Sequence, residues 1–210
     1  MQSPPLHLFV DAQFTSPFAM SVYVALQEKQ LDFEMSVVDL NANENAAPAY
    51  AAISATRRVP TLTHGRFSLS ESSAITEYLE DVFPHARLYP ADPELRARAR
   101  QVQAWLRSDL LPLRQERPTE VVFYQSRKPP LSPAAQAAAH KFVAATEALL
   151  PDGAEHLCGT WSIADCDLAM MLNRLAMHGD PLPARLREYA ERQWARPAIQ
   201  RWMRMNRPPA

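Results

Sequence analysis

The sequence contains only two cysteines in 210 residues, Cys158 and Cys166, and their spacing fits neither a CxxC redox pair nor a zinc site. A chain of this length can bury a sizeable hydrophobic core without disulfides. We therefore expect both thiols to be buried as small hydrophobic groups, in a protein of a reducing compartment such as the cytoplasm. The cysteine pattern predicts neither a structural disulfide nor a bound metal.

The chain also lacks long apolar runs and an excess of charge of either sign. No window approaches the eighteen or more apolar residues of a membrane span, and residues 1–5 contain no basic segment typical of a signal peptide. The formal net charge is −1, from 22 basic and 23 acidic residues. These observations predict a cytoplasmic globular protein whose partners are neither membranes nor nucleic acids.

The first part of the chain alternates short β-favouring runs with helical patterns. A helix is expected where Ile75, Leu79 and Val82 recur at three- and four-residue steps. Gly65 accepts a positive φ and predicts a hairpin between two strands. The expected order is strand, helix, strand, an ill-defined segment, two strands and a helix. These elements cover residues 6–10, 17–29, 33–40, 61–63, 67–69 and 72–82.

After a linker at residues 85–92, every remaining pattern is helical. Ser162 and Asp165 have the spacing of a capping box, in which each side chain satisfies a free N–H group at the start of a helix. The other helix starts are Asp92-Pro93, Ser132-Pro133 and the segments from residues 184 and 197. The sequence therefore predicts an α/β domain at residues 1–84 and an all-helical domain at residues 93–210.

Three segments of the first domain place polar groups where a ligand is readily bound. Ser16 precedes the first expected helix, where N–H groups and the helix dipole favour an anion. Pro60 enters a strand, and X-Pro bonds are those for which a cis peptide costs little. Glu71 and Ser72 begin another helix and suit the ammonium and carboxylate groups of one amino acid. Taken singly, each segment is explained at least as well by helix capping or by a trans proline on an edge strand.

In this order and spacing, Ser16, Val59-Pro60 and Glu71-Ser72 resemble the glutathione-site motifs of the cytosolic glutathione transferases, in their bacterial, serine-type form. The resemblance covers the whole chain, including its helical second half. It implies a thioredoxin-like first domain of order βαβαββα, an all-α helical bundle as the second domain, and a homodimer.

The resemblance also implies a role for each of these residues. Ser16 is expected to donate a hydrogen bond to the thiolate of bound glutathione. The backbone of Val59, next to a cis Pro60, is expected to pair with the cysteinyl unit. Glu71 and Ser72 are expected to hold the γ-glutamyl end.

Two assignments stay open among neighbouring residues. Thr15 and Ser21 compete with Ser16 as the hydroxyl donor, although position at the helix start favours Ser16. Arg58 is the candidate for the glycyl carboxylate of glutathione, with Arg57 as its competitor. A solvated pair of arginines explains these two residues equally well.

The function implied is that of a glutathione transferase, in which the activated thiolate attacks a small electrophilic co-substrate. Glutathione serves as a co-substrate, and no further cofactor or metal is implied. Glutathione-dependent reduction of organic hydroperoxides in oxidative-stress defence is a close alternative, and a non-catalytic binding module of the same fold is an alternative of another class. Six residues of the helical half could line an apolar wall of the second-substrate site, and core packing explains them equally well. They are Trp105, Leu106, Leu110, Arg114, Phe123 and Tyr124.

Overall fold

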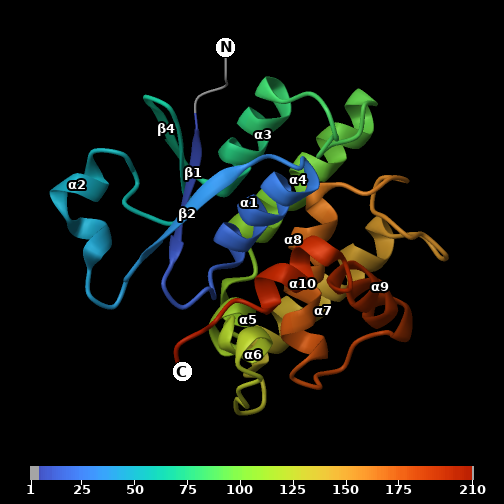
Figure 1. Ribbon diagram of the computed structural model, residues 1–210. Helices are drawn as coiled ribbons and strands as arrows, with labels where there is room; N and C mark the ends of the chain where they lie inside the picture. Colours follow the sequence, from blue (N-terminus) through green and yellow to red (C-terminus); the bar gives the residue numbers. More distant parts are fainter. Residues whose placement is uncertain (1–4, 210) are drawn as a thin grey trace. The chain divides into compact units, whose positions relative to one another are not determined.

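The protein is represented by a computed structural model, in which residues 5–209 are described (Figure 1). The described chain divides into two compact units. The first unit comprises residues 5–88 and 198–209, and the second comprises residues 89–197. The chain therefore leaves the first unit once and returns to it near its C-terminal end.

The first unit is built on a mixed sheet with helices. Its elements are β1 (Leu6–Asp11), α1 (Pro17–Glu28), β2 (Phe33–Val38), η1 (Glu44–Ala46), α2 (Pro48–Ala51), β3 (Thr61–His64), β4 (Phe67–Ser70) and α3 (Ser72–Val82). The four strands lie in the order β2-β1-β3-β4. β1 is parallel to β2, and β3 is antiparallel to both β1 and β4. This is the thioredoxin-like arrangement that the sequence predicts, and the ill-defined segment contains η1 and α2.

The core of the first unit lies around β1 and α1. Leu6, Leu8 and Val10 are buried and alternate with half-buried residues along β1, because successive strand side chains point to opposite faces. α1 buries every residue from Ala19 to Leu26, and a helix with buried residues all around it is an internal helix. Gly65, with φ of 60°, forms the predicted hairpin between β3 and β4.

The C-terminal segment belongs to the first unit, whereas the sequence places it in the helical domain. α10 (Pro197–Met203) carries Trp202, whose side chain is fully buried. Its ring centroid lies 5.2 Å from that of Tyr23 and 5.7 Å from that of Phe14. The Arg207 guanidinium also donates to the Phe14 carbonyl at 3.3 Å. These aromatic contacts, between residues far apart in the sequence, join residues 198–209 to the first unit.

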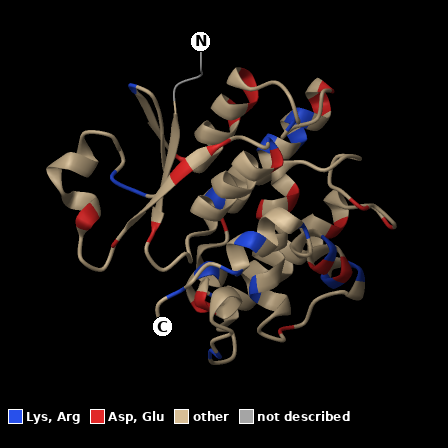
Figure 2. Ribbon diagram, in the orientation of Figure 1, with Lys and Arg blue, Asp and Glu red and all other residues tan. Residues whose placement is uncertain are grey.

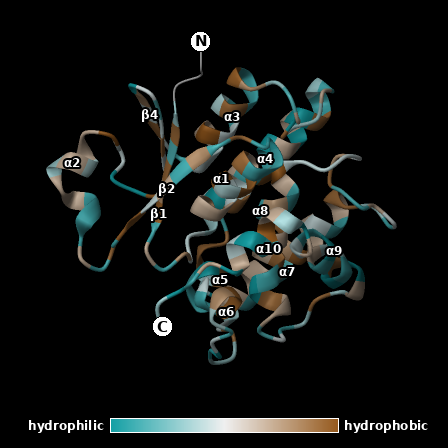
Figure 3. Cartoon of the chain, viewed as in Figure 1, coloured by the Kyte–Doolittle hydropathy of each residue, from teal (hydrophilic) through white to brown (hydrophobic). Residues whose placement is uncertain are grey.

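The second unit consists of helices, as predicted. They are α4 (Pro93–Ser108), α5 (Leu111–Glu116), α6 (Glu120–Phe123), α7 (Pro133–Leu149), α8 (Ile163–Ala176) and α9 (Ala184–Trp194). Asp92 and Ser132 cap α4 and α7 through their side chains, which confirms these two helix starts. Basic and acidic residues are interspersed over these helices (Figure 2), and α9 is largely hydrophilic on its exposed turns (Figure 3).

The short helices α5 and α6 have no counterpart in the sequence prediction. Leu110 adopts a φ of 61°, so the helical path ends after α4 and a new one begins. Pro112 and Pro118 further divide this stretch into short pieces, because proline is tolerated only in the first turn of a helix. Such short helices leave little periodicity in the sequence to detect.

A buried carboxylate organises the start of α8. Asp165 is fully buried, and its side chain accepts from the backbone N–H groups of Ser162 and Leu157, both at 2.8 Å. It also accepts from the hydroxyls of Ser162 at 3.0 Å and Tyr189 at 2.7 Å. Burial, and then the charge of Asp165, raise the pKa of Tyr189, so this hydroxyl keeps its proton and acts as the donor. The predicted capping box is confirmed and also ties α9 to α8.

Both cysteines, Cys158 and Cys166, are buried, as the sequence predicts, and neither forms a disulfide within residues 5–209. Burial raises the pKa of the Cys158 thiol. Among residues 5–209, no group of three or more His, Cys, Asp or Glu side chains is placed to hold a metal ion. Within the same part of the chain, no helix combines the length and apolar character that a bilayer span requires.

We predict that Asp165→Ala lowers the free energy of unfolding by about 3 kcal/mol or more, because four buried donors lose their acceptor. Urea-induced unfolding followed by circular dichroism measures this change. Asp152→Ala is the control: the Asp152 side chain is 93% exposed, and its ion pair with Arg185 contributes less than about 1 kcal/mol. Similar destabilisation by both variants would contradict the role of Asp165.

Candidate functional site

One rung of the sheet brings the three predicted site segments to the same edge. Phe9 of β1 pairs with Thr61 of β3, and Thr61 pairs with Ser70 of β4. Because β3 is antiparallel to both neighbours, the residues after β1, before β3 and after β4 all extend from the same end of the sheet. The segments that contain Ser16, Val59-Pro60 and Glu71-Ser72 therefore lie at this end of the sheet.

Ser16 is the N-cap residue of α1, as its position before Pro17 predicts. Its Oγ accepts a hydrogen bond from the Ala19 N–H group at 3.2 Å. An oxygen that accepts this bond still has its own hydroxyl hydrogen to donate. Ser16 is half-buried, so this hydrogen is placed at a helix N-terminus that is still partly accessible.

Asp11 fixes the loop that leads to Ser16. Its carboxylate, in a residue only 2% exposed, accepts from the Thr15 N–H at 2.7 Å and the Thr15 hydroxyl at 3.1 Å. It also accepts from the Ser16 N–H at 3.1 Å. Asp11 is not among the residues predicted from the sequence, in which its only signal is an acidic residue directly after a hydrophobic strand run. Asp11 thus holds the backbone of Ser16 while leaving its hydroxyl to other partners.

The Val59-Pro60 peptide bond is cis. Three hydroxyls surround the carbonyl of the preceding residue, Arg58: that of Tyr50 at 2.9 Å, that of Thr61 at 3.0 Å and that of Ser54 at 3.4 Å. Burial raises the pKa of Tyr50, so its hydroxyl stays protonated and can donate to this carbonyl.

This hydroxyl cluster, formed by Tyr50, Ser54 and Thr61, is likewise not predicted from the sequence. It fixes the backbone directly before Val59 from α2 and from the start of β3. Val59 itself is half-buried, and neither its N–H nor its C=O bonds to another group of the described chain. The Val59 backbone is therefore free to pair with an extended ligand.

Arg57 and Arg58 are both exposed next to this segment. The Arg57 carbonyl accepts from the Asn45 side chain at 3.0 Å, and its φ of 52° lies in the left-handed region. The backbone is thus held at both residues while the guanidinium groups face solvent. The choice between them as an anion ligand stays a prediction.

Glu71 and Ser72 form the third segment. α3 begins at Ser72, which is buried, and the Glu71 carbonyl accepts the first helical bond from Ile75 at 2.9 Å. Glu71 has a φ of 74°, and its exposed side chain makes no capping hydrogen bond. Helix capping by its carboxylate, the alternative reading of Glu71, therefore has no counterpart in the structure. The carboxylate projects from a left-handed backbone position at the end of β4.

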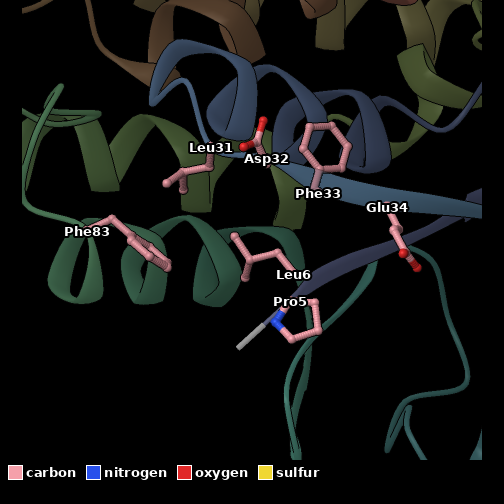
Figure 4. A pocket seen from close by; sticks show the side chains of 7 residues that line it. All are labelled: Pro5, Leu6, Leu31, Asp32, Phe33, Glu34 and Phe83. Atoms are coloured by element: carbon pink, nitrogen blue, oxygen red, sulfur yellow. The ribbon is translucent and has the colours of Figure 1, made fainter. Parts of the chain in front are cut away.

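A separate hollow of about 580 Å³ lies at the opposite end of β1, near Leu6 (Figure 4). It is lined by Pro5, Leu6, Leu31, Asp32, Phe33, Glu34 and Phe83. None of the predicted site residues lines it. It is therefore distinct from the edge where Ser16, Val59 and Glu71 are found.

Comparison with known proteins identifies the family. The family model for the glutathione S-transferase C-terminal domain matches residues 92–207, and the model for the glutathione S-transferase N-terminal domain matches residues 15–82. The chain belongs to the glutathione S-transferase family. This confirms the family that the sequence motifs predict, whereas the bacterial, serine-type form stays a prediction.

A solved structure of a glutathione transferase homolog from Burkholderia gl BGR1, with bound glutathione, is 47% identical to this chain. It covers 94% of this chain and 95% of its own, with a TM-score of 0.77. The chain is also similar to glutathione S-transferase 1 of Dianthus caryophyllus, at 38% identity over 98 residues, 47% of this chain and 44% of that protein. Maleylacetoacetate isomerase of Pseudomonas aeruginosa is 38% identical over 103 residues, 48% of this chain and 49% of that protein. The chain spans about half the length of the curated relatives it matches.

We predict that Asp11→Ala lowers the hydrogen-exchange protection of the Thr15 and Ser16 amides by about tenfold, because both lose their acceptor. Amide exchange followed by NMR measures this protection. Asp32→Ala is the matched control, since Asp32 is an exposed acid of the same unit. Unchanged protection at both amides in Asp11→Ala would contradict the role of this carboxylate.

Proposed function

We propose that this protein is a glutathione transferase that binds glutathione at the sheet end defined by the Phe9–Thr61–Ser70 rung. The observation that supports this proposal most strongly is the hydrogen bonding of the Ser16 hydroxyl. Its Oγ accepts from Ala19, so its hydroxyl hydrogen is left to donate to a thiolate at the start of α1. The glutathione bound in the structure of the Burkholderia homolog supports the same ligand.

In this proposal, Ser16 acts by stabilising the reactive ionised form of the glutathione thiol. The thiolate is the nucleophile, and a free cysteine thiol has a pKa of about 8.5. One hydrogen bond from Ser16 together with the dipole of α1 favours the thiolate over the thiol. Lowering the thiol pKa by two units corresponds to about 2.7 kcal/mol of preferential stabilisation. The thiolate then forms a C–S bond to an electrophilic carbon of the second substrate, and the leaving group departs with the electron pair of the bond that breaks.

The two competing hydroxyls are less suited to this role. The Thr15 hydroxyl already donates to Asp11 at 3.1 Å. Ser21 is fully buried inside α1, where a ligand has no access to its hydroxyl. These two observations favour Ser16 as the residue that contacts the sulfur.

The remaining residues are assigned to the binding of the peptide. The free backbone groups of Val59 pair with the cysteinyl unit, as a strand pairs with a sheet edge. Glu71 holds the ammonium group of the γ-glutamyl end, and Ser72 binds its carboxylate at the N-terminus of α3. Arg58 is the proposed partner of the glycyl carboxylate, with Arg57 as the alternative.

A glutathione-dependent isomerase is the second candidate function, favoured by the similarity to maleylacetoacetate isomerase. Reduction of organic hydroperoxides uses the same thiolate and stays a proposed alternative. Assays with an electrophile, a cis-enoyl diacid and a hydroperoxide distinguish the three reactions. A non-catalytic module of the same fold would bind glutathione weakly or not at all.

A homodimer, implied by the family, is part of the proposal. Sedimentation equilibrium that shows only monomer at micromolar concentration would reject it.

We predict that the protein forms glutathione thiolate below pH 8, measured by the ultraviolet absorbance of the thiolate during titration across pH. In Ser16→Ala, the pKa of the bound thiol rises toward about 8.5, because the hydrogen bond to the sulfur is lost. Turnover falls by about 10²-fold, whereas the glutathione Kd changes by less than about threefold.

Ser68→Ala is the matched control for Ser16→Ala, because Ser68 is a half-buried serine of β4 in the same unit. In Ser68→Ala, the pKa of the bound glutathione thiol and the turnover are expected to equal those of the parent protein. If the bound glutathione thiol in Ser16→Ala has the same pKa as in the parent protein, a group other than Ser16 stabilises the thiolate. Absence of glutathione binding in the parent would instead favour the non-catalytic module.

We predict that Glu71→Gln weakens glutathione binding by about tenfold or more, because the proposed ion pair with the ammonium group is lost. Isothermal titration calorimetry measures the Kd. Glu34→Gln is the control, since the Glu34 side chain is 79% exposed at the opposite end of the sheet. Equal affinities in Glu71→Gln and Glu34→Gln would reject the ammonium contact.

A further inference from the structure

The second unit concentrates buried polar atoms that have no hydrogen-bond partner. Five of the ten such side-chain atoms in the described chain lie within residues 114–126 and 173–174. They are Arg114 Nε, Glu120 Oε2, Ser126 Oγ, Asn173 Nδ2 and Arg174 Nε. A buried polar group without a partner is costly, so such a cluster indicates a place where a ligand supplies the partners.

Arg174 is the most deeply buried charged group of this cluster. It lies on α8 and is 6% exposed. Its Nη1 donates to the Arg117 carbonyl at 2.6 Å, whereas its Nε has no partner. Burial is the main cause that lowers the pKa of Arg174 to about 10, so the guanidinium still carries its charge at neutral pH. The part of the chain that the structure describes thus supplies a neutral carbonyl to this group but no carboxylate in direct contact.

Two further charged groups lie close to Arg174, from α5 and α6. The positive charge of Arg114 lowers the pKa of Arg174, and the negative charge of Glu120 raises it. Arg114 and Glu120 are half-buried, so the cluster extends from the buried Arg174 toward the surface of the unit. Two guanidinium groups and one carboxylate leave a net charge of +1, and each of the three has an unpartnered atom.

Arg117 of the same unit is a buried arginine whose guanidinium donates to protein acceptors through all three of its nitrogens. It is 1% exposed, and its Nε and Nη2 donate to the two carboxylate oxygens of Asp180 at 2.6 and 2.9 Å. Its Nη1 donates to the carbonyls of Glu116 and Pro129 at 2.9 and 3.0 Å. Arg174 is nearly as buried but has no such bidentate partner among residues 5–209.

We propose that Arg114 and Arg174 bind the carboxylate of a small organic acid, a site within the second unit that is separate from the glutathione site proposed above. A planar guanidinium matches a carboxylate through two parallel N–H donors, which is the arrangement that Asp180 provides for Arg117. One carboxylate neutralises the net charge of +1, whereas a phosphate dianion would reverse it. A carboxylate is therefore the class of ligand that fits.

The test is an NMR titration of the full-length protein with sodium butyrate at pH 7 and constant ionic strength, following the arginine Nε–H resonances. We expect the Arg174 Nε–H resonance to move and to saturate. The Arg117 Nε–H resonance is the internal control and stays in place, because Asp180 already occupies it. Arg174→Lys assigns the resonance by its loss.

Two variants at half-buried positions keep the test independent of the folding of Arg174→Lys. Arg114→Gln is expected to weaken butyrate binding by about fivefold or more, and Glu120→Gln to strengthen it several-fold by removing a competing negative charge. A non-saturating shift, an equal shift with chloride, or tighter binding of inorganic phosphate would overturn the proposal. Unchanged or weaker binding in Glu120→Gln would also overturn it, because Glu120 would then not compete with the ligand.

Discussion

The antiparallel pairing of β3 with both β1 and β4 is the constraint on which the candidate site depends. It places the end of β1, the start of β3 and the end of β4 at one edge of the sheet. A shift of register by one residue would move every side chain of a strand to the opposite face. Buried polar groups hold the segments beyond that rung: Asp11 holds the loop before α1, and the hydroxyl of Tyr50 holds the backbone before Val59.

Much of the fold could be predicted from local patterns, because helix starts depend on residues close in sequence. Ser16, Asp92 and Ser132 each precede a proline and each cap a helix through the side chain. The bounds of α3 agree with the expected residues 72–82 for the same reason, since its apolar residues recur at helical spacing. The candidate glutathione residues were predicted from the family motifs and not from any one of these local signals.

The parts that the sequence could not reveal depend on contacts between distant residues. The bond from Tyr50 to the Arg58 carbonyl exists only after α2 has packed near β3. The placement of residues 198–209 follows from the packing of the Trp202 ring against that of Tyr23, a residue separated from it by most of the chain. The pairing of Arg117 with Asp180, and the lack of any similar partner for Arg174, likewise require the folded second unit.

The return of α10 to the first unit has a consequence for the order in which the protein folds in the cell. Residues 89–197 are inserted within the first unit, so the chain joins the two units by two covalent connections. A ribosome releases the chain from its N-terminal end, and domains fold as they emerge. The surface of α1 around Tyr23 therefore stays uncovered until Trp202 has emerged, after the whole inserted segment. The first unit to begin folding is the last to be completed.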